Sequence, residues 1–363
     1  MINETTINLR DCFFTEKEHE IIKHSEMKAT IFRYASGVAG LKVENKRGSV
    51  IMLPFQGQQI WRCFFDGREL AMKSIFNEPE ATSDYLGNYG CFFLHCGATA
   101  VGVPAKNDTH PLHGELPNAR YKEAYVSCGK NSKGNYIAIG GRYEHKIAFN
   151  HRYLAEPLVT IYEDSGVLDI SIKFTNLLKT QMELMYLAHI NFRPVDNSEL
   201  AYSAKYDPEH VAVNINVPEH IKTSAPIEDF KAFLRRLKDD PVLHHHIDPD
   251  ALFDPEVVIS IKYDSDETGA ARSMQVHPDG YADYVLHYPA QLPRALRWIA
   301  RNPDHDAMGL VLPSTSGNDG YIAERAAGNF IALAPGASIK FDLQAGLLTA
   351  EEASQMKRKI ENR

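Results

Sequence analysis

The chain has 363 residues, of which 44% are hydrophobic, and it carries a formal net charge of −8 with an isoelectric point near 6.1. This length and apolar content allow a large buried core, either in one big β domain or in two average ones. Because no block of basic residues interrupts the acidic balance, we expect no surface that follows phosphates and no nucleic-acid partner.

The first residues and the cysteines indicate the compartment. The opening MINETTINLRDCFF lacks the basic start and apolar run of a secretory signal, and no stretch approaches the ~20 apolar residues of a membrane span. The five cysteines form no C-x-x-C pair, which disfavours a disulfide framework and a thiolate zinc site. We therefore expect a cytoplasmic protein with buried thiols and no membrane partner; the cysteines are Cys12, Cys63, Cys91, Cys96 and Cys128.

In chain order, the first expected element is a short helix over 16–24, in TEKEHEIIKH. Short strands separated by turns follow, at 28–35, 38–45, 48–54 and 136–145. The clearest strand is LDISIKFTN, where Ile170, Ile172 and Phe174 alternate with polar residues. It follows LVTIY across the turn residues 163–166, so the two runs predict a β-hairpin.

The later part of the chain continues this pattern, with strand-like runs at 255–264, 273–289, 307–313 and 330–345. PIEDFKAFLRRL predicts a helix over 226–238, because its apolar residues repeat at helical spacing from Phe230 to Leu237. Thr349 followed by Glu352 is a capping box, which predicts a last helix over 349–361. Since helices do not alternate with strands, the sheets should be antiparallel.

The predicted fold class is therefore mainly β, a large antiparallel β-sandwich with a few short helices. No long linker and no fixed-period repeat divides the chain. We expect a single β-sandwich domain over 1–363, in which residues 1–29 form a peripheral N-terminal arm.

Three polar stretches are candidates for a pocket. In LPFQGQQIW, the amides of Gln56 and Gln58 stand near Trp61, a combination that suits the hydroxyls and the apolar face of a sugar. Taken alone, this stretch is better explained by a turn and a core tryptophan. A glycine-rich run with little regular strand propensity holds more polar groups, at His95, His110, His113 and Glu115.

Histidine titrates near neutral pH, so one of these imidazoles could pass a proton at a sugar ring oxygen. The alternative is that His110 and His113 only bind loop backbone. In the third stretch, MYLAHINFRPVD, His189, Asn191 and Arg193 alternate after an apolar lead-in. A strand places all three on one face, which predicts a wet pocket there.

These residues resemble a known family, the aldose 1-epimerases or galactose mutarotases. HPLHGELPNA resembles their histidine-bearing loop, and MYLAHINF resembles their His-Pro-Tyr-Phe-Asn strand, with His189 and Asn191 in matching places. The turn 333–336, Leu-Ala-Pro-Gly, looks like the Leu-x-Pro-Gly turn before the family's final strand. QGQQIW, LHCG and HPLHGELPNA look most like an aldose-epimerase-like branch, and the likeness covers about residues 30 to 348.

The resemblance implies a galactose mutarotase-like supersandwich that binds a sugar or sugar derivative without a cofactor. By position, His189 would be the catalytic acid and His113 an assisting or sugar-binding histidine, although His110 could exchange roles with His113. The remaining expected sugar-binding residues are Gln58, Trp61, His95, His110, Glu115, Asn191 and Arg193. Three cations, Lys73, Arg142 and Arg193, could bind an anionic sugar but are also ordinary surface charges. The sequence does not decide between a monomer and a homodimer.

The chain departs from the family at the catalytic base. Where the family carries a glutamate, this sequence reads GLVLPST over 309–315, without a carboxylate. Glu324 is the expected replacement and Asp319 an alternative, although Glu324 beside Arg325 could equally form a surface ion pair. This departure leaves two outcomes, an altered reaction or a non-catalytic sugar-binding module.

A third class is a metal-dependent sugar isomerase or lyase. It would draw its nitrogen and oxygen ligands from His95, His110, His113, Glu115 and His189. The spacing lacks the one-residue histidine separation of β-barrel metal sites. In the triplet 244–246, adjacent side chains of an extended segment point to alternate faces, so one ion cannot easily use all three. We therefore expect no metal.

Overall fold

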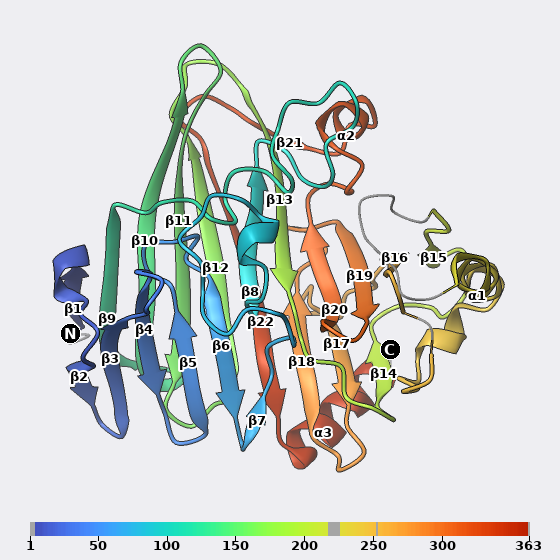
Figure 1. The fold of residues 1–363 in the computed structure, drawn as a ribbon, viewed down its shortest axis with the longest axis horizontal. Helices are drawn as coiled ribbons and strands as arrows, with labels where there is room; N and C mark the ends of the chain where they lie inside the picture. The colour runs from blue at the N-terminus through green and yellow to red at the C-terminus, as the bar shows by residue number, and fades with distance from the viewer. Residues whose placement is uncertain (1–3, 217–225, 252, 362–363) are drawn as a thin grey trace.

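The computed structural model describes residues 4–216, 226–251 and 253–361, and its strands form two stacked antiparallel sheets (Figure 1). We call them the back sheet and the front sheet, after their positions in Figure 1. Within the described residues, nine strands make the back sheet, in the order β1-β9-β10-β11-β12-β22-β18-β17-β14. Their bounds are Thr5–Leu9 (β1), Glu123–Asn131 (β9), Gly134–Ile147 (β10), His151–Tyr162 (β11), Val167–Asn176 (β12), Ser338–Leu348 (β22), Ala282–His287 (β18), Ala271–Val276 (β17) and Glu199–Tyr202 (β14).

The front sheet has thirteen strands among the described residues, in the order β15-β16-β19-β20-β13-β8-β6-β5-β4-β3-β2, with β21 paired to β13 and β7 to β6. Their bounds are Val211–Val213 (β15), Val257–Ile261 (β16), Arg294–Arg301 (β19), Asp306–Ser314 (β20), Met182–Ile190 (β13), Phe93–Ala98 (β8), Ile60–Phe65 (β6), Gly48–Met52 (β5), Ala39–Glu44 (β4), Met27–Arg33 (β3), His19–His24 (β2), Ile331–Leu333 (β21) and Arg68–Glu69 (β7). The predicted β-rich antiparallel fold is confirmed.

Two of the predicted helices are confirmed, α1 at Ile227–Asp239 and α3 at Ala350–Glu361. The short α2 helix, Tyr321–Ala326, was not predicted. Single 3-10 turns lie at Asp11–Phe13 (η1), Leu86–Asn88 (η2) and Pro241–His244 (η3). In α1, the predicted helical spacing buries Phe230, Leu234 and Leu237 on one face.

The helix expected over 16–24 is wrong, because this segment forms the edge strand β2. Its register against β3 shifts between Glu20 and Ile22, where a bulge inserts an extra residue. The bulge breaks the period-two pattern of the sequence and so conceals the strand. The stretch that holds His95, expected to be irregular, is likewise a strand, β8, buried on both faces next to β13.

The main core lies between the two sheets. Phe174 of β12 contacts Tyr186 of β13, with ring centroids 5.5 Å apart, and Tyr186 stacks on Phe341 of β22 at 5.3 Å. Ile170 and Ile172 are buried in the same cluster, as the alternation of LDISIKFTN predicts. Burial of such side chains stabilises the sandwich by about 1.5–3 kcal/mol each.

The N-terminal segment supplies the last strand of each sheet, β1 in the back sheet and β2 in the front sheet. Both strands therefore lie at sheet edges, on the left of Figure 1. We retain the organisation as one domain over 1–363, with 1–29 as a peripheral arm, as a proposal.

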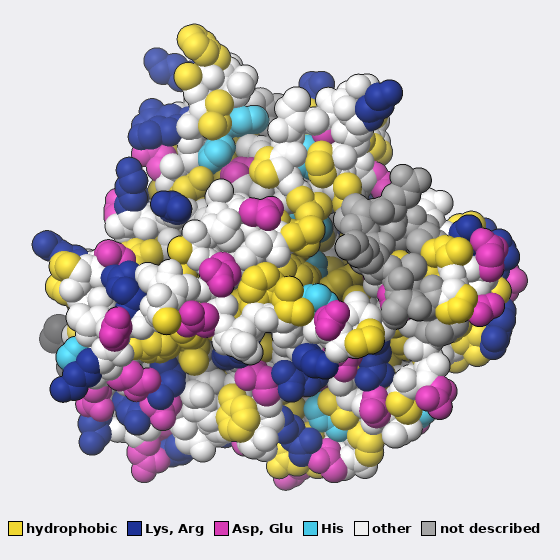
Figure 2. Space-filling model, in the orientation of Figure 1, with side chains coloured by type: hydrophobic (Ala, Val, Ile, Leu, Met, Phe, Trp, Pro, Cys, Tyr) yellow, Lys and Arg dark blue, Asp and Glu magenta, His cyan; other side chains and the backbone are white. Residues whose placement is uncertain are grey.

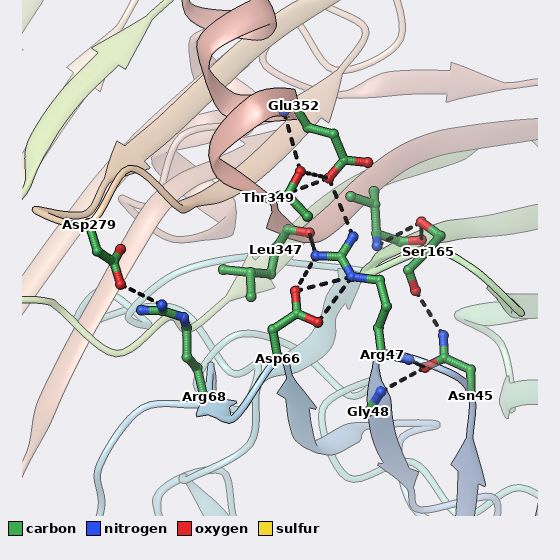
Figure 3. Close-up of polar contacts among 11 residues, drawn as sticks. Asn45, Arg47, Gly48, Asp66, Arg68, Ser165, Asp279, Leu347, Thr349 and Glu352 are labelled. Carbon is green, nitrogen blue, oxygen red and sulfur yellow. Dashed lines mark hydrogen bonds and ion pairs between the residues drawn. The ribbon is translucent and has the colours of Figure 1, made fainter.

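Arg47, in the turn between β4 and β5, ties the front sheet to the C-terminal helix (Figure 3). Its guanidinium is paired with the Asp66 carboxylate, donates to the Leu347 carbonyl at 3.3 Å and contacts Glu352 Oε2 at 3.4 Å. Glu352 also accepts from the backbone N–H of Thr349 at 2.8 Å and from its hydroxyl at 2.9 Å. The predicted capping box is therefore present and linked to the front sheet.

Candidate active site

A pocket opens on the face of the front sheet that is turned away from the back sheet. Figure 2 shows hydrophobic side chains gathered in a hollow in the middle of this face, with histidine among them. The hollow contains ≈ 700 Å³ of empty space, including solvent at its mouth. It is lined by Tyr85, Leu86, Tyr89, Gly102, Val103, Leu112, His113, Leu187, His189, Glu256, Val258, Leu296, Trp298, Leu312 and Asn318.

Strand alternation places the floor residues of this pocket. On β13, Tyr186 and Ala188 face the core between the sheets, whereas Leu187 and His189 line the pocket. The same alternation brings Leu296 and Trp298 of β19 to the pocket. Val258 of β16 is paired with Trp298, so the floor continues across neighbouring strands.

His189 is 4% exposed, and its ring lies 5.6 Å from the ring of Trp298. Its Nε2 is 3.4 Å from the hydroxyl of Tyr89, whereas its buried Nδ1 has no hydrogen-bond partner among the residues that the structure describes. Burial lowers the pKa of His189 to about 4, because a charged imidazolium would lose its hydration here. The imidazole is therefore neutral at pH 7 and can offer one ring N–H.

His113 lies next to His189 in the pocket, edge to face with ring centroids 5.6 Å apart, although 76 positions separate them in the sequence. Its backbone has a positive φ of 56° and is held by two β-like contacts, its N–H donating to Gly102 and its carbonyl accepting from Gly97. Its ring also packs 4.9 Å from that of Tyr85. His113 and His189 therefore line one cavity.

Glu256 is the carboxylate that lines this pocket among the described residues. It directly precedes β16, and its Oε2 accepts a hydrogen bond of 2.6 Å from the indole N–H of Trp298. Trp298 therefore contacts both Glu256 and His189. This contact brings an acid-base histidine and a carboxylate to the same indole ring.

A network of buried amides holds the loop that carries Tyr85 and Tyr89. The side chain of Asn118 accepts from Gln59 at 3.0 Å and from Asn88 at 3.1 Å, and it donates to the Asp84 carbonyl at 2.9 Å. Gln59 and Asn118 belong to the QGQQIW and HPLHGELPNA stretches. These stretches thus support the pocket wall through a neighbouring loop.

The structure places Gln58, Trp61 and His95 outside the pocket lining. Gln58 is buried and donates to the Pro54 carbonyl within its own turn. Trp61 is buried in the apolar cluster beneath the pocket floor, so the simpler interpretation as a core tryptophan applies. His95 lies in the core between the sheets, with Nδ1 2.8 Å from the hydroxyl of Tyr186. Its position on β8 turns its side chain to the core face.

Glu115 and His110 serve the neighbouring loops. Glu115 accepts from the backbone N–H of Ala98 at 3.1 Å and from the Thr99 hydroxyl at 2.7 Å. His110 Nε2 accepts from the Tyr321 N–H at 3.3 Å, so it joins its loop to the start of α2. Of the two interchangeable histidines, only His113 lines the pocket.

Asn191 lies beside the pocket and Arg193 does not. The Tyr89 hydroxyl, which is near His189, donates to Asn191 Oδ1 at 3.2 Å. Asn191 therefore orients a pocket tyrosine. Arg193 is exposed beyond the end of β13, where the regular alternation of the strand no longer applies.

Glu324, expected as the base, does not line the pocket. It is 3% exposed and accepts from the backbone N–H of Gly317 at 2.8 Å, from that of Asp319 at 3.2 Å, and from the Asn329 amide at 2.7 Å. These bonds use the carboxylate to hold the loop that carries Asn318. Asp319 is exposed and also lies outside the lining.

The expected metal-ligand candidates are not assembled. Among the residues that the structure describes, no group of three or more His, Cys, Asp or Glu is arranged so that it could hold a metal ion. In the histidine triplet, His244 contacts Arg297 at 2.7 Å and His245 contacts the Tyr202 hydroxyl at 2.7 Å.

Within the described ranges, no helix is long and apolar enough to cross a membrane.

Sequence reasoning missed Glu256, Trp298, Tyr85 and Tyr89. Glu256 begins a run that we predicted as a strand, and its alternation with Val258 was visible. That pattern defines two faces but does not show which face lies under a pocket. Trp298 follows the same rule on β19, so neither residue carried a local signal for the site.

The two stacked antiparallel sheets have the fold of galactose mutarotase-like proteins. The fold matches a proposed aldose 1-epimerase from Klebsiella pneumoniae with a TM-score of 0.80 and 16% identity, over 99% of this chain and 96% of that chain. Galactose mutarotase-like proteins from Clostridium acetobutylicum (TM-score 0.56, 12% identity, 92% and 98% covered) and Lactobacillus casei (0.54, 14%, 85% and 100%) are also similar. At these identities the likeness concerns the fold.

The chain belongs to the family described as a domain of unknown function, DUF4432, whose model matches residues 35–347. No curated protein matches the chain.

Proposed function

We propose that the chain is an isomerase of the aldose 1-epimerase type, which interconverts the anomers of a sugar in this pocket. The observation that carries the proposal is that His189 and Glu256 both lie beside Trp298 and line one cavity. A proton donor and a proton acceptor on one ligand site are the two groups that ring opening requires. The mutarotase-like fold supports the same conclusion.

In the proposed reaction, Glu256 accepts the proton of the anomeric hydroxyl while the protonated, imidazolium form of His189 donates a proton to the ring oxygen and becomes neutral. The C1–O bond of the ring breaks and the anomeric C–O bond becomes a carbonyl. Rotation about C1–C2 and the reverse proton transfers give the other anomer. Protons and electrons balance, and neither a cofactor nor a metal takes part.

Glu256 takes the role that the sequence analysis gave to Glu324. The two carboxylates differ in what they contact, since Glu324 is held by backbone and amide donors outside the lining whereas Glu256 lies at the pocket. Trp298 and the tyrosines at positions 85 and 89 offer aromatic faces for the C–H groups of a sugar ring. His113, opposite His189, is placed to bind or assist.

The test is anomer exchange measured by NMR over a panel of sugars, with Glu256→Gln and His189→Gln as the variants. Each change preserves side-chain size and removes a proton-transfer group, so we expect turnover to fall by ~10²-fold or more while ligand binding persists. Glu267→Gln, in an exposed turn outside the pocket, is the matched control. Unchanged exchange in Glu256→Gln would remove this residue as the base.

A second candidate is a non-catalytic sugar-binding module. It is favoured by the low pKa of His189, about 4, which leaves no protonated imidazolium at neutral pH. In that case the wild-type protein would bind a sugar with no exchange above the uncatalysed rate. Binding titrations run beside the NMR exchange assay separate the two candidates.

A further inference from the structure

We infer that the ligand of this pocket is an uncharged sugar with an apolar edge, a deoxy sugar in which hydrogen replaces a hydroxyl and leaves a methyl or methylene group. The inference rests on the proposed function for the ligand being a sugar. The proposed reaction does not specify the class of sugar. That class follows from the charged groups and the aliphatic side chains that line the pocket.

The first argument is charge. Among the described lining residues there is no lysine or arginine, and the charged side chain is the carboxylate of Glu256. A phosphate or carboxylate on the ligand would lose water without gaining a cation and would lie near a like charge. Both effects oppose an anionic sugar.

The three cations expected to bind an anionic sugar lie outside the described lining of the pocket. Arg142 lies 3.7 Å from Glu123 and 3.3 Å from Glu156 on the back sheet. Lys73 donates to the Pro303 carbonyl at 3.0 Å. The third cation, Arg193, is exposed beyond the end of β13. None of these side chains is part of the described lining.

The second argument is the nature of the walls. Seven aliphatic side chains line the pocket: Leu86, Val103, Leu112, Leu187, Val258, Leu296 and Leu312. Three of them, Leu187, Leu296 and Leu312, are packed in one continuous cluster that forms the floor. A hydroxyl turned toward this floor would lose its water partners without replacement, which costs roughly tenfold or more in affinity.

Two hydrogen-bond donors of the pocket already donate to other side chains of the protein. The indole N–H of Trp298 donates to Glu256, and the hydroxyl of Tyr89 donates to Asn191. His189 and Glu256 would serve the ring oxygen and the anomeric hydroxyl. For the other hydroxyls of a sugar the lining offers His113, Tyr85 and Asn318, and the rest of its surface is largely aliphatic and suits an edge without hydroxyls.

The experiment uses two sets of sugars that differ only at C6. The galacto set is D-fucose, D-galactose, D-galacturonate and D-galactose 6-phosphate, and the gluco set has the same four groups. We expect affinity to be highest for the methyl member and lowest for the two anions, by at least about tenfold. Titration calorimetry gives affinity, and NMR gives anomer exchange.

The outcomes separate this inference from the proposed function. Exchange that is faster or binding that is tighter for an anionic member than for the methyl member overturns the inference and leaves the isomerase proposal in place. The expected order of affinities without any exchange supports the inference and overturns the isomerase proposal. Absence of binding by every member of both sets overturns the inference.

A lysine introduced at the rim of the pocket tests the argument from charge independently. Leu86 lines the pocket but is 54% exposed, so Leu86→Lys should fold normally and bring an ammonium to the rim. We expect it to raise affinity for the 6-phosphates relative to the methyl sugars by about tenfold. Ile75→Lys, 62% exposed and outside the lining, should leave the ratio unchanged. An unchanged ratio in Leu86→Lys contradicts the charge argument.

Discussion

At the scale of single residues, the protonation of His189 is set by burial. The folded environment removes hydration from the imidazolium and lowers the pKa to about 4, against 6.5 for an ordinary histidine. We predict that the His189 ring stays neutral between pH 7 and pH 5. Ring carbon shifts followed by NMR across this range check it, with His189→Gln identifying the signal. A titration centred near 6.5 would contradict the prediction.

Glu324 offers a second prediction at this scale. Glu324→Gln places an amide N–H against the donors that now face the carboxylate, the backbone N–H groups of Gly317 and Asp319 and the Asn329 amide. We expect the free energy of unfolding to fall by roughly 1–3 kcal/mol. Anomer exchange per folded molecule should fall by less than in Glu256→Gln. Denaturant titration and NMR exchange measure the two effects, and complete loss of exchange with intact folding would restore Glu324 as the base.

At the scale of elements, the attachment of α3 depends on Glu352. Its carboxylate accepts from Thr349 at the start of the helix and contacts Arg47 of the front sheet (Figure 3). We predict that Glu352→Ala destabilises the protein by about 0.5–2 kcal/mol, because it removes both the cap and the contact. Denaturant midpoints measure the change. Glu351→Ala, also in the first turn of α3, is the matched control, and an equal loss in both variants would show that the cap is not the cause.

At the scale of the whole molecule, several histidines are buried in neutral form. Burial lowers the pKa of His95 and of His287 to about 3, and that of His189 to about 4. Between pH 6.5 and 4 the unfolded chain binds protons at these positions that the folded chain does not. The stability they contribute is thus present above pH 6.5 and is lost as pH falls, by about 2 kcal/mol each at pH 5.

We therefore predict a steep fall in unfolding free energy between pH 7 and pH 5, measured by denaturant titration at each pH. His287→Gln should reduce this slope, because the amide does not titrate. Carboxylates with a lowered pKa act in a lower window: hydrogen bonds from Ser25 and Asn135 lower the pKa of Glu163 to about 2, so its contribution is lost below about pH 4.5. Constant stability from pH 7 to pH 5 would contradict the role of the histidines.

The sequence by itself determined the elements whose causes are local. The alternation of Ile170, Ile172 and Phe174 predicted a half-buried strand, the spacing in α1 predicted an amphipathic helix, and Thr349 with Glu352 predicted where α3 begins. Each signal lies within a few residues of its effect. The resemblance to the mutarotases added the expectation of a sugar-binding supersandwich and the roles of His189 and His113.

Only the tertiary structure decided the rest of the site. Pairing of β16 with β19 brings Glu256 to Trp298 across 42 positions, and pairing of β19 and β20 in the same sheet completes the floor. Alternation along a strand divides its side chains between two faces, but it does not say which face meets the other sheet. That assignment put His95 in the core and His189 in the pocket. It depends on contacts between distant segments, which no local pattern records.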